Sequence, residues 1–317
     1  MMIKTMQTIM TFLPMLLTVA FLTLMERKML ATSQMRKGPN IVGFYGLLQP
    51  MADAMKLMMK EANKPNKTNS LLFTLSPMMS MSMALTTWSL IPLHNKSPQS
   101  DTSMSMIMML ALSSLSVYTI LLTGWASNSK YSLLGSMRAT AQMMSYEMSI
   151  GLMMLCVMYL SSSLSLSTIT ESQMNIWFLM PLFPAFTMLL MSSLAETNRT
   201  PFDLTESESE LVSGFNVEYS ATLFTLLFLA EYTNILLMSA ILSMLFLGST
   251  TMNNTSTPMM LATKMLTITY MFMWARATYP RTRYDQLMHL VWKSYLPMSL
   301  SLTMLIPSIM IFFHCSP

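Results

Sequence analysis

The sequence predicts an all-α, polytopic membrane protein with about eight transmembrane helices and one amphipathic interfacial helix, in a single integral membrane domain over residues 1–317. Hydrophobic residues make up 53% of the chain and charged residues only 10%, whereas a soluble globular chain carries about 25% charged residues. The mean hydropathy is +0.48. The apolar residues also occur in runs that reach the ~20 residues a helix needs to cross a bilayer.

Eight apolar runs alternate with charged or Pro-, Asn- and Ser-rich breaks. We expect the transmembrane helices over residues 3–25, 69–92, 103–124, 138–160, 174–195, 218–248, 258–277 and 287–314. The sixth run is long enough to tilt or break within the membrane. The first run is longer than the apolar core of a cleavable signal sequence, so we interpret it as a membrane span.

The chain contains 43 methionines, at positions where Leu or Ile would serve equally well. One interpretation is adaptable apolar filler, because Met packs into irregular gaps. A second interpretation is a genetic code that reads an extra codon as Met, as animal mitochondria do. A hydrophobic chain without a separate targeting peptide agrees with synthesis inside that organelle.

The basic residues predict the orientation of the helices. Of the 18 Lys and Arg residues, 15 lie in or beside the loops that follow the first, third, fifth and seventh runs. Because Lys and Arg are retained on the negative side of a membrane, these odd-numbered loops should face that side. In a mitochondrion this side is the matrix, and both termini would then face the intermembrane space.

Metal, disulfide and nucleotide chemistry find no support in the sequence. The cysteines, Cys156 and Cys315, and the histidines, His94, His289 and His314, are scattered and lack the spacing of metal or iron–sulfur ligands. No glycine-rich nucleotide loop follows a predicted strand. The basic residues are not interleaved with aromatic residues that would stack on bases, so nucleic acid is not an expected partner.

An amphipathic segment follows the first run. Residues 47–60 carry two stripes at helical spacing, a polar one of Gln49, Asp53, Lys56 and Lys60 and an apolar one of Leu47, Met51, Met55 and Met58. Such a helix lies in the plane of the membrane interface with its apolar stripe buried. The nearby Arg27, Arg36 and Lys37 allow two interpretations, contact with lipid headgroups or the mouth of a site for a lipid-soluble ligand.

Half of the acidic residues gather in and near one segment. Residues 195–219, here called the acidic segment, and the nearby Glu231 hold seven of the 14 carboxylates: Glu196, Asp203, Glu206, Glu208, Glu210, Glu218 and Glu231. We expect an acidic matrix loop at 196–217, and Glu147 lies inside the fourth run. A carboxylate at mid-bilayer costs at least ~2.5 kcal/mol, so an ionisable group retained there is a functional candidate.

Several physical roles compete for these acids. Thr205 and the residues after it fit a helix capping box, and Arg199 is expected to pair with one acid. Asp203, Glu206 and Glu210 are spaced to share one helical face, where like charges repel. The remaining acids either hydrogen-bond between helices in protonated form or line a hydrated proton path. Burial and acidic neighbours would raise their pKa values, which suits proton exchange near neutral pH.

Several long motifs resemble one known family. They are ERKML (26–30), QMRKGPN (34–40), GLLQPMADAMKL (46–57), GWASNSKYSLLGSMRATAQMMSYE (124–147), AETNRTPFDLTESESELVSGFNVEY (195–219) and YPRTRYDQLMHLVWK (279–293). In order and spacing, from Met1 to about Trp292, they resemble the chain 1 family of NADH:ubiquinone oxidoreductase, the membrane subunits of respiratory complex I beside its peripheral arm. The methionine-rich runs are similar to those of animal mitochondrial members.

The resemblance implies an eight-helix subunit and roles for particular residues. A ubiquinone tunnel entered from the bilayer would be lined or supported by Arg27, Arg36, Asp53, Phe224 and Arg276. A proton path from the quinone cavity toward the proton-pumping membrane arm would use Glu147, Glu196, Asp203, Glu206, Glu208, Glu210, Glu218 and Glu231, with Arg199 in support. No residue would act as a chemical acid or base on the substrate, and no metal site is expected.

The resemblance also implies a setting, the mitochondrial inner membrane, and an enzyme, the proton-translocating NADH:ubiquinone reductase. The chain itself would bind no NADH, FMN or iron–sulfur cluster, and it would share ubiquinone with neighbouring subunits. Its partners would be the peripheral quinone-site subunits, the neighbouring membrane-arm subunits and membrane lipids. Ala62, Thr200 and Ser207 replace the family's usual Pro, Ala and Gly, and none of these differences removes an ionisable group.

Two functions from other classes compete with this one. A stand-alone ion or solute transporter would transport by itself and would show pseudo-symmetric halves, which we do not find in the sequence. A structural anchor for a peripheral enzyme arm would use the acids only to dock its partner. A related hydrogenase subunit of the same family is disfavoured by the animal-like loops.

Overall fold

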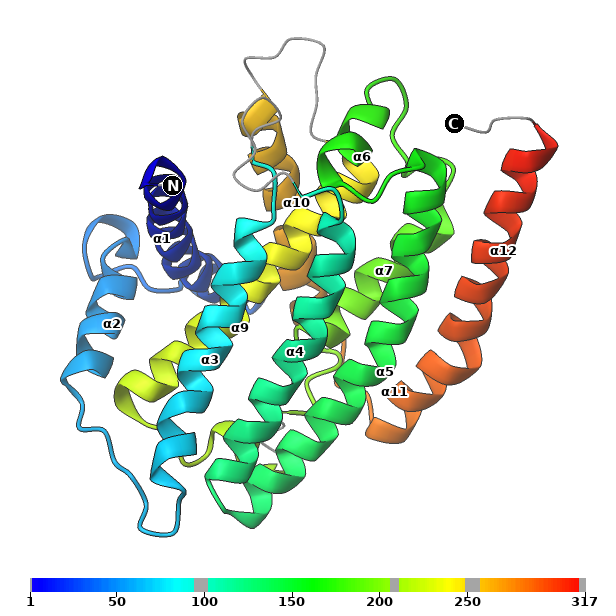
Figure 1. The fold of residues 1–317 in the computed structure, drawn as a ribbon. Helices are drawn as coiled ribbons and strands as arrows, with labels where there is room; N and C mark the ends of the chain where they lie inside the picture. Colours follow the sequence, from blue (N-terminus) through cyan, green and yellow to red (C-terminus); the bar gives the residue numbers. More distant parts are fainter. Residues whose placement is uncertain (1, 94–101, 206–210, 249–256, 314–317) are drawn as a thin grey trace.

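The computed structural model describes residues 2–93, 102–205, 211–248 and 257–313. Over these ranges the chain forms helices and loops and no strand, which confirms the all-α prediction (Figure 1). The long helices are α1 (Met2–Ser33), α3 (Ser70–Ser89), α4 (Ser105–Ala126), α5 (Lys130–Ser161), α7 (Phe183–Glu196), α9 (Ala221–Leu242), α10 (Thr257–Thr278) and α12 (Leu296–Phe312). The short ones are α2 (Gln49–Met59), α6 (Leu166–Ser172) and α11 (Tyr284–Leu290).

Short helical turns of other types complete these elements. A π-helical turn over Ser243–Leu247 continues α9, and a second one over Val291–Tyr295 joins α11 to α12. Tighter 3₁₀ turns lie at Phe44–Gly46 and Gly214–Asn216. The sixth and eighth predicted runs are therefore each one continuous helical stretch, not a broken helix.

Five helical stretches are long and apolar enough to cross a membrane. They are Ile9–Ser33, Ser105–Ala126, Lys130–Ser161, Ala221–Leu247 and Tyr284–Phe312, and they match the first, third, fourth, sixth and eighth predicted runs. The chain is accordingly a multi-pass membrane protein. Helices α3, α7 and α10 occupy the other three predicted runs, and α7, with 14 residues, is shorter than the ~20 residues that one crossing needs.

Two helices begin at residues other than the first residue of the predicted run. Helix α5 begins at Lys130, not at residue 138, because the turn from α4 needs few residues and the hydroxyls of Ser127 and Ser129 both bond to Ser132. Helix α7 begins at Phe183, not at residue 174. Pro184 fits the first turn of α7, where backbone N–H groups have no acceptor within the helix. Pro181 disfavours an earlier start of the helix.

Helix α1 is longer than its predicted run. It continues to Ser33, so that Glu26, Arg27 and Lys28 lie on the helix and not after it. Lys28 donates a hydrogen bond of 2.6 Å to the carbonyl of Tyr45, which holds the next loop against the end of α1. Helix α2 lies where the interfacial helix is predicted, with Pro50 in its first turn and no buried side chain.

Small residues bring α4 and α5 close together. A Cβ atom at Gly124 would collide with the Ser136 side chain, so only glycine permits this helix crossing. Hydroxyl groups in the bundle are satisfied largely within their own helices, as when Ser149 donates 2.8 Å to the Tyr146 carbonyl. This arrangement lets Ser and Thr lie in an apolar bundle without unpaired donors.

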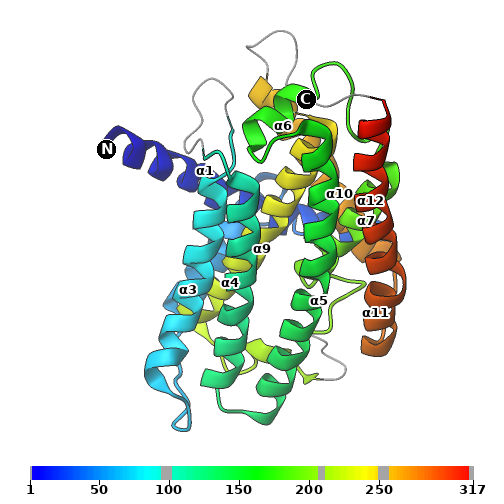
Figure 2. The same cartoon turned by 45° about the vertical axis from the view of Figure 1, so that its right-hand side comes forward.

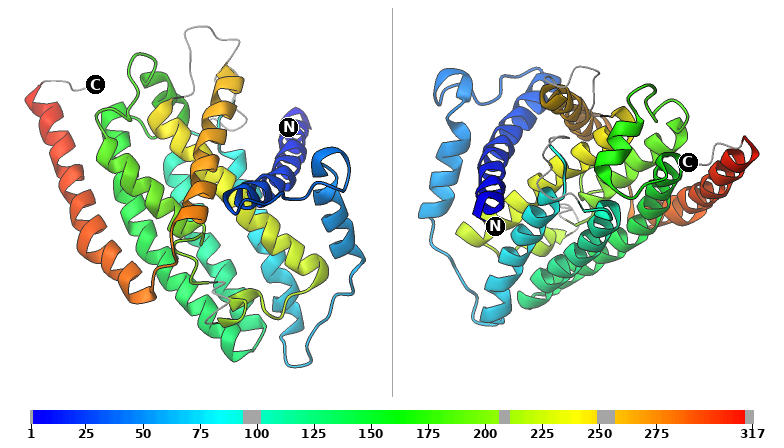
Figure 3. Two further views of the ribbon diagram at one scale, coloured as in Figure 1. Left: turned by 180° about the vertical axis from the view of Figure 1, so that it is seen from behind. Right: turned by 45° about the horizontal axis from the view of Figure 1, so that its top comes forward.

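Helix α9 lies in the middle of the fold. It packs against α3 on one side and against α1 and α10 on the other, and the views from the front and from behind show it between these layers (Figures 1 and 3). Helix α5 packs against α4, α7 and α12. Helix α1 runs obliquely to α3, α4 and α5 (Figure 2). The start of α1 and the end of α12 lie at the same end of the molecule (Figures 1 and 2).

Candidate functional site

Glu26 is the centre of a buried cluster of charged and polar groups, here called the Glu26 cluster. It lies on α1 with 5% of its surface exposed. Its Oε1 accepts a hydrogen bond of 2.9 Å from Arg199 Nη1, and the Arg276 guanidinium pairs with the same oxygen. Its Oε2 accepts a hydrogen bond of 2.7 Å from the Tyr232 hydroxyl. The cluster thus joins α1, the loop after α7, α9 and α10.

The Glu26 cluster carries excess positive charge. Two guanidinium groups face one carboxylate, which they stabilise in its ionised form by charge-assisted hydrogen bonds, so the net charge is +1. The Arg199 guanidinium also lies over the Tyr232 ring, 4.3 Å from its centroid, as in cation–π pairs. A hollow of about 20 Å³ beside Glu26, lined also by Leu22 and Phe272, has room for one water-sized group. The cluster suits binding of a carbonyl oxygen or a developing negative charge.

A row of aromatic rings on α9 leads to this cluster. Phe224, Phe228 and Tyr232 are four residues apart, so they lie on one face of the helix. The ring centroids of Phe224 and Phe228 are 5.8 Å apart, and those of Phe228 and Tyr232 are 4.7 Å apart. Helix α2 also packs against α9. The predicted tunnel residue Phe224 is therefore connected by ring contacts to Arg199.

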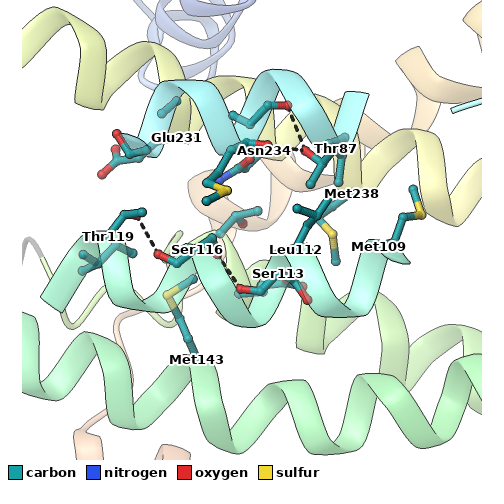
Figure 4. A pocket seen from close by; sticks show the side chains of 18 of the residues that line it. Thr87, Met109, Leu112, Ser113, Ser116, Thr119, Met143, Glu231, Asn234 and Met238 are labelled. Carbon is teal, nitrogen blue, oxygen red and sulfur yellow. Dashed lines mark hydrogen bonds between the residues drawn. The ribbon is translucent and has the colours of Figure 1, made fainter. Parts of the chain in front are cut away.

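The other side of α9 borders a cavity, here called the central cavity, whose largely apolar lining carries several polar side chains. Its volume is about 80 Å³, which holds several waters at the ~10–15 Å³ that one requires. Hydroxyl groups of α4 face Glu231 and Asn234 of α9 across it (Figure 4). Those hydroxyl-bearing residues are Ser113, Ser116 and Thr119. Waters in this cavity would have the two to four polar partners that buried water needs.

Glu196 also lines the central cavity, from the end of α7 and beyond the fifth predicted run. Its Oε2 is buried and has no hydrogen-bond partner among the described residues. Burial, with the nearby Glu147 carboxylate as a second cause, raises the pKa of Glu196 to about 7. Glu147 is hydrogen-bonded to Ser113, which lines the same cavity. Glu196 and Glu231 therefore line one hydratable space, and Glu147 is connected to it through Ser113.

Tyr219 lies near one end of this cavity, just before α9. Its hydroxyl donates a hydrogen bond of 3.0 Å to the Thr123 carbonyl and lies 3.3 Å from Ser76 Oγ. Its ring stacks on Phe73 with centroids 4.2 Å apart. The Tyr219 side chain thus holds α3, α4 and the loop before α9 together.

Basic residues at the end of α1 and in the loop after it form an open hollow near α2. Its volume is about 340 Å³, and Arg27, Arg36, Gly38 and Pro39 line it together with Leu30. Arg27 Nη1 pairs with Asp53 Oδ2 of α2 at 2.6 Å. That contact joins the hollow to the amphipathic helix, whose stripe of Leu47, Met51, Met55 and Met58 is half to two-thirds exposed.

The acidic segment is divided between several places. Asp203 pairs with Arg281 at 3.2 Å, and it lies in a loop, so the prediction that it shares a helical face is wrong. The carbonyl of Pro201 accepts hydrogen bonds from Thr282, which fixes this loop against the chain before α11. Glu218 lies between Asn216 and α9 and is half-buried. Glu206, Glu208 and Glu210, with the predicted capping box, lie outside the described residues.

The structure brings some predicted residues together and separates others. In the described part of the chain Arg199 pairs with Glu26 and not with an acid of its own segment. Among the predicted tunnel residues, Arg276 joins Arg199 in the Glu26 cluster, while Arg27, Arg36 and Asp53 lie at the open hollow. Within the described residues no group of three His, Cys, Asp or Glu side chains has the arrangement of a metal site.

Sequence reasoning missed Glu26 and Tyr232 as site residues. In the sequence, Glu26 follows an apolar run and precedes two basic residues, and a glutamate at the end of such a run is common. Tyr232 follows Glu231 and completes the four-residue spacing with Phe224, which was the available signal. The Ser and Thr side chains of the central cavity gave no signal, because hydroxyl residues are common throughout the runs.

Comparisons with known proteins give one consistent result. The family model described as NADH dehydrogenase matches residues 6–307. The chain is 54% identical to NADH-ubiquinone oxidoreductase chain 1 of Tolypeutes matacus, over 92% of both chains. It is 50% identical to the protein of the same name in Sarcophilus harrisii, over 99% of this chain and 98% of that one. It is 53% identical to the protein of the same name in Oncorhynchus mykiss, over 92% of this chain and 90% of that one.

Proposed function

The chain belongs to the family of NADH-ubiquinone oxidoreductase chain 1, and on this premise we propose that it forms part of the ubiquinone tunnel of respiratory complex I and couples ubiquinone reduction to proton translocation. As a subunit of this oxidoreductase it works inside a larger enzyme. Electrons from NADH reach ubiquinone beside it, and the chain supplies access for the quinone and carboxylates for the protons.

On the quinone side, the tunnel begins at the hollow of Arg27 and Arg36. The exposed apolar stripe of α2 lies beside this hollow, which suits a ligand that arrives from the bilayer. The aromatic row from Phe224 to Tyr232 offers ring faces along the way, and Asp53 holds Arg27 in place. Tunnel residue Arg276 and its partner Arg199 bring positive charge to the Glu26 cluster, where it would stabilise charge that develops on the quinone.

On the proton side, Glu196 and Glu231 line the central cavity, and Glu147 is connected to it through Ser113. Waters among their carboxyls and the hydroxyls of α4 would carry protons between them. The raised pKa of Glu196, about 7, means that it exchanges protons near neutral pH. Because Glu147 and Glu196 interact electrostatically, a change in the protonation of one shifts the titration of the other. Asp203, Glu206, Glu208, Glu210 and Glu218 extend this proton path along the acidic segment.

The proposal depends on one observation: the Glu26 cluster and the central cavity lie on opposite sides of α9. Tyr232 contacts the Glu26 cluster, while its neighbour Glu231 lines the central cavity. Arg199 and Glu196, three residues apart, reach the same two sites from the loop after α7. A change of charge in the quinone-side cluster is therefore transmitted to the carboxylates through α9 and this loop, as a shift in their protonation or position.

We further propose the membrane arrangement of the chain. It is a single membrane domain over residues 1–317 with eight crossings, in which α3, α7 with the chain before it, and α10 cross in addition to the five long apolar stretches. Its odd-numbered loops face the matrix and both termini face the intermembrane space of the mitochondrial inner membrane. Its partners are the peripheral quinone-site subunits, the neighbouring membrane-arm subunits, ubiquinone and lipids, and the chain binds no cofactor by itself.

Variants of the assembled complex test the proton role. Glu196→Gln and Glu231→Gln should lower the number of protons pumped per NADH oxidised by ubiquinone. NADH oxidation by a hydrophilic artificial acceptor should stay unchanged, because that reaction does not reach this chain. Exposed Glu171 of α6 supplies a matched control in Glu171→Gln. Full quinone turnover with full pumping in both cavity variants would remove the proton role.

The tunnel role is tested separately by quinone kinetics. Arg36→Ala should raise the apparent KM for ubiquinone, whereas Lys67→Ala, which removes an exposed charge from a nearby loop, should not. An unchanged KM in Arg36→Ala would assign this arginine to lipid headgroups. A purely anchoring role of the chain would instead lower the amount of assembled complex in the glutamate variants without changing the protons pumped per electron.

A further inference from the structure

A fully buried glutamine fixes the loop that connects the two proposed sites. Gln142 lies on α5 and is 0% exposed. Its Nε2 donates hydrogen bonds of 2.8 Å to the Ala195 carbonyl and 2.9 Å to the Phe202 carbonyl. The first carbonyl lies in the last turn of α7 and the second lies in the loop that follows. One amide group thus ties both ends of the segment 195–202 to α5.

The residues between the two carbonyls are the ones that reach the two sites. Glu196 follows the first carbonyl directly and lines the central cavity. Arg199 lies midway between them and pairs with Glu26. The loop is closed internally by a hydrogen bond of 2.7 Å from the Phe202 amide to the Arg199 carbonyl. With both ends held, a displacement of Arg199 moves the loop as a unit and reaches Glu196.

We propose that Gln142 is a positioning residue for the coupling between quinone and protons. It holds Glu196 in the central cavity and Arg199 on Glu26 at the same time, so that each side chain responds to the other site. This inference rests on the proposed function of the two sites. The amide contributes only its two N–H donors, because Oε1 has no hydrogen-bond partner among the described residues.

The required chemistry distinguishes Gln142 from a packing residue. Methionine has nearly the same length and volume but no N–H donors, so Gln142→Met preserves packing and removes one donor from each carbonyl. Asparagine keeps the donors but is shorter by one methylene, so Gln142→Asn cannot reach both carbonyls together. Each carbonyl would keep one backbone donor, Asn198 N–H at 3.2 Å for Ala195 and Leu204 N–H at 3.0 Å for Phe202. What is lost is the pair of hydrogen bonds that fixes this part of the chain to α5, so it would be held less firmly.

The chain contains a matched control for both changes. Gln173 at the end of α6 is 2% exposed, and its Nε2 donates to the carbonyls of Met244 at 2.9 Å and Leu245 at 3.1 Å. It therefore makes the same two-carbonyl contact, but at the far end of α9 from Glu196 and Arg199. Gln173→Met and Gln173→Asn measure the effect of losing such a contact where no coupling is proposed.

The experiment uses the assembled complex in sealed membrane vesicles. NADH oxidation by a hydrophilic acceptor normalises each variant for the amount of complex. Ubiquinone reduction is then measured against ubiquinone concentration, and proton uptake is measured per ubiquinone reduced. Losing hydrogen bonds of this kind changes an equilibrium roughly five- to ten-fold, so we expect Gln142→Met to raise the ubiquinone KM by that factor and to lower the proton ratio, and Gln142→Asn to do so more weakly. The Gln173 variants should change neither.

A double-variant cycle supplies the decisive readout. If Gln142 acts through Glu196, adding Gln142→Met to Glu196→Gln should lower the proton ratio no further. Independent, multiplying losses would overturn the proposal, and so would an unchanged KM and proton ratio in Gln142→Met. Failure of both Gln142 variants to assemble, while both Gln173 variants assemble, would assign Gln142 to folding alone. If Glu196→Gln by itself has no effect, the proposed function fails and not only the role of Gln142.

Discussion

The Tyr232 hydroxyl donates a hydrogen bond of 2.7 Å to Oε2 of Glu26, although the two residues are 206 positions apart in the chain. This bond places the middle of α9 against the end of α1. The residue before Tyr232, Glu231, lies on the cavity side of the same helix turn. A single helix turn of α9 therefore presents a phenol to the arginine–glutamate cluster and a carboxyl to the central cavity.

Removing only the Tyr232 hydroxyl should weaken the contact between α9 and α1. Tyr232→Phe keeps the ring that contacts Phe228 and Arg199, but a hydrogen bond to a charged group contributes about 1.5–3 kcal/mol. We expect a lower ubiquinone reduction rate and a lower melting temperature of the membrane arm. Tyr159→Phe removes a hydroxyl from a half-exposed ring on α5 and should change neither. Equal behaviour of the two variants would contradict a special role for the Tyr232 hydroxyl.

Neutralising Glu26 should be more severe than losing its tyrosine partner. Breaking a buried ion pair by removing one partner costs ~3–5 kcal/mol, and we expect the lower end because the Arg276 side chain is 35% exposed. Glu26→Gln should therefore reduce the amount of assembled complex and the ubiquinone turnover of what assembles. Blue-native gels and normalised activity measure the two effects. Glu26→Asp, which keeps the charge, should recover part of both, and no recovery would argue that length rather than charge matters.

The sequence predicted the helices well where apolar runs are continuous, and less well where local chemistry decides. The end of α1 was missed because Glu26, Arg27 and Lys28 interrupt the apolar pattern without interrupting the helix. The late start of α7 depends on Pro184, a local signal that a count of apolar residues does not weigh. Helix α6 lies in a Ser-rich stretch with no apolar run, and its position depends on tertiary contacts such as those of Gln173.

The candidate site was predictable in its residue types but not in its pairing. Ionisable groups in an oily chain identified Arg199, Glu196 and Glu231 as candidates. The partner of Arg199 was not predictable, because a contact between α1 and the loop after α7 depends on how helices pack and not on spacing in the sequence. The same holds for Gln142, whose two carbonyl partners are brought together only by the folded loop.

The titration of Glu196 should be visible in the pH dependence of stability and activity. Its folded pKa is raised from 4.5 to about 7, so between these pH values the folded form holds a proton that the unfolded form releases. The contribution of Glu196 to stability is therefore fully present below pH 4.5 and is lost as the pH rises through about 7. Glu196→Gln, which stays neutral, should flatten the pH dependence of melting temperature and of proton pumping over this range. A wild-type profile retained in Glu196→Gln would assign the titration to another group.

Filling the central cavity should block proton transfer without removing any ionisable group. The cavity holds about 80 Å³, so the larger apolar side chain of Ser116→Leu would displace much of its water. We expect ubiquinone-linked proton pumping to fall while oxidation of NADH by a hydrophilic acceptor is kept. Ser82→Leu makes the same change at an exposed position of α3 and should leave pumping intact. Undiminished pumping in an assembled Ser116→Leu complex would show that protons take another route.

The ion pair of Asp203 and Arg281 should contribute more to stability and activity than the ion pair of Arg283 and Asp285. Arg281 is 31% and Asp203 13% exposed in their side chains, whereas Arg283 and Asp285 are 79% and 70% exposed. Exposed ion pairs contribute about 0–1 kcal/mol, so Arg283→Ala should leave stability and activity unchanged. Arg281→Ala removes a half-buried contact that holds the Pro201 loop against the chain before α11, and that loop carries Arg199. We therefore expect a higher ubiquinone KM in Arg281→Ala, with unchanged NADH oxidation by a hydrophilic acceptor. Equal KM values in Arg281→Ala and Arg283→Ala would contradict this structural role of the Asp203–Arg281 pair.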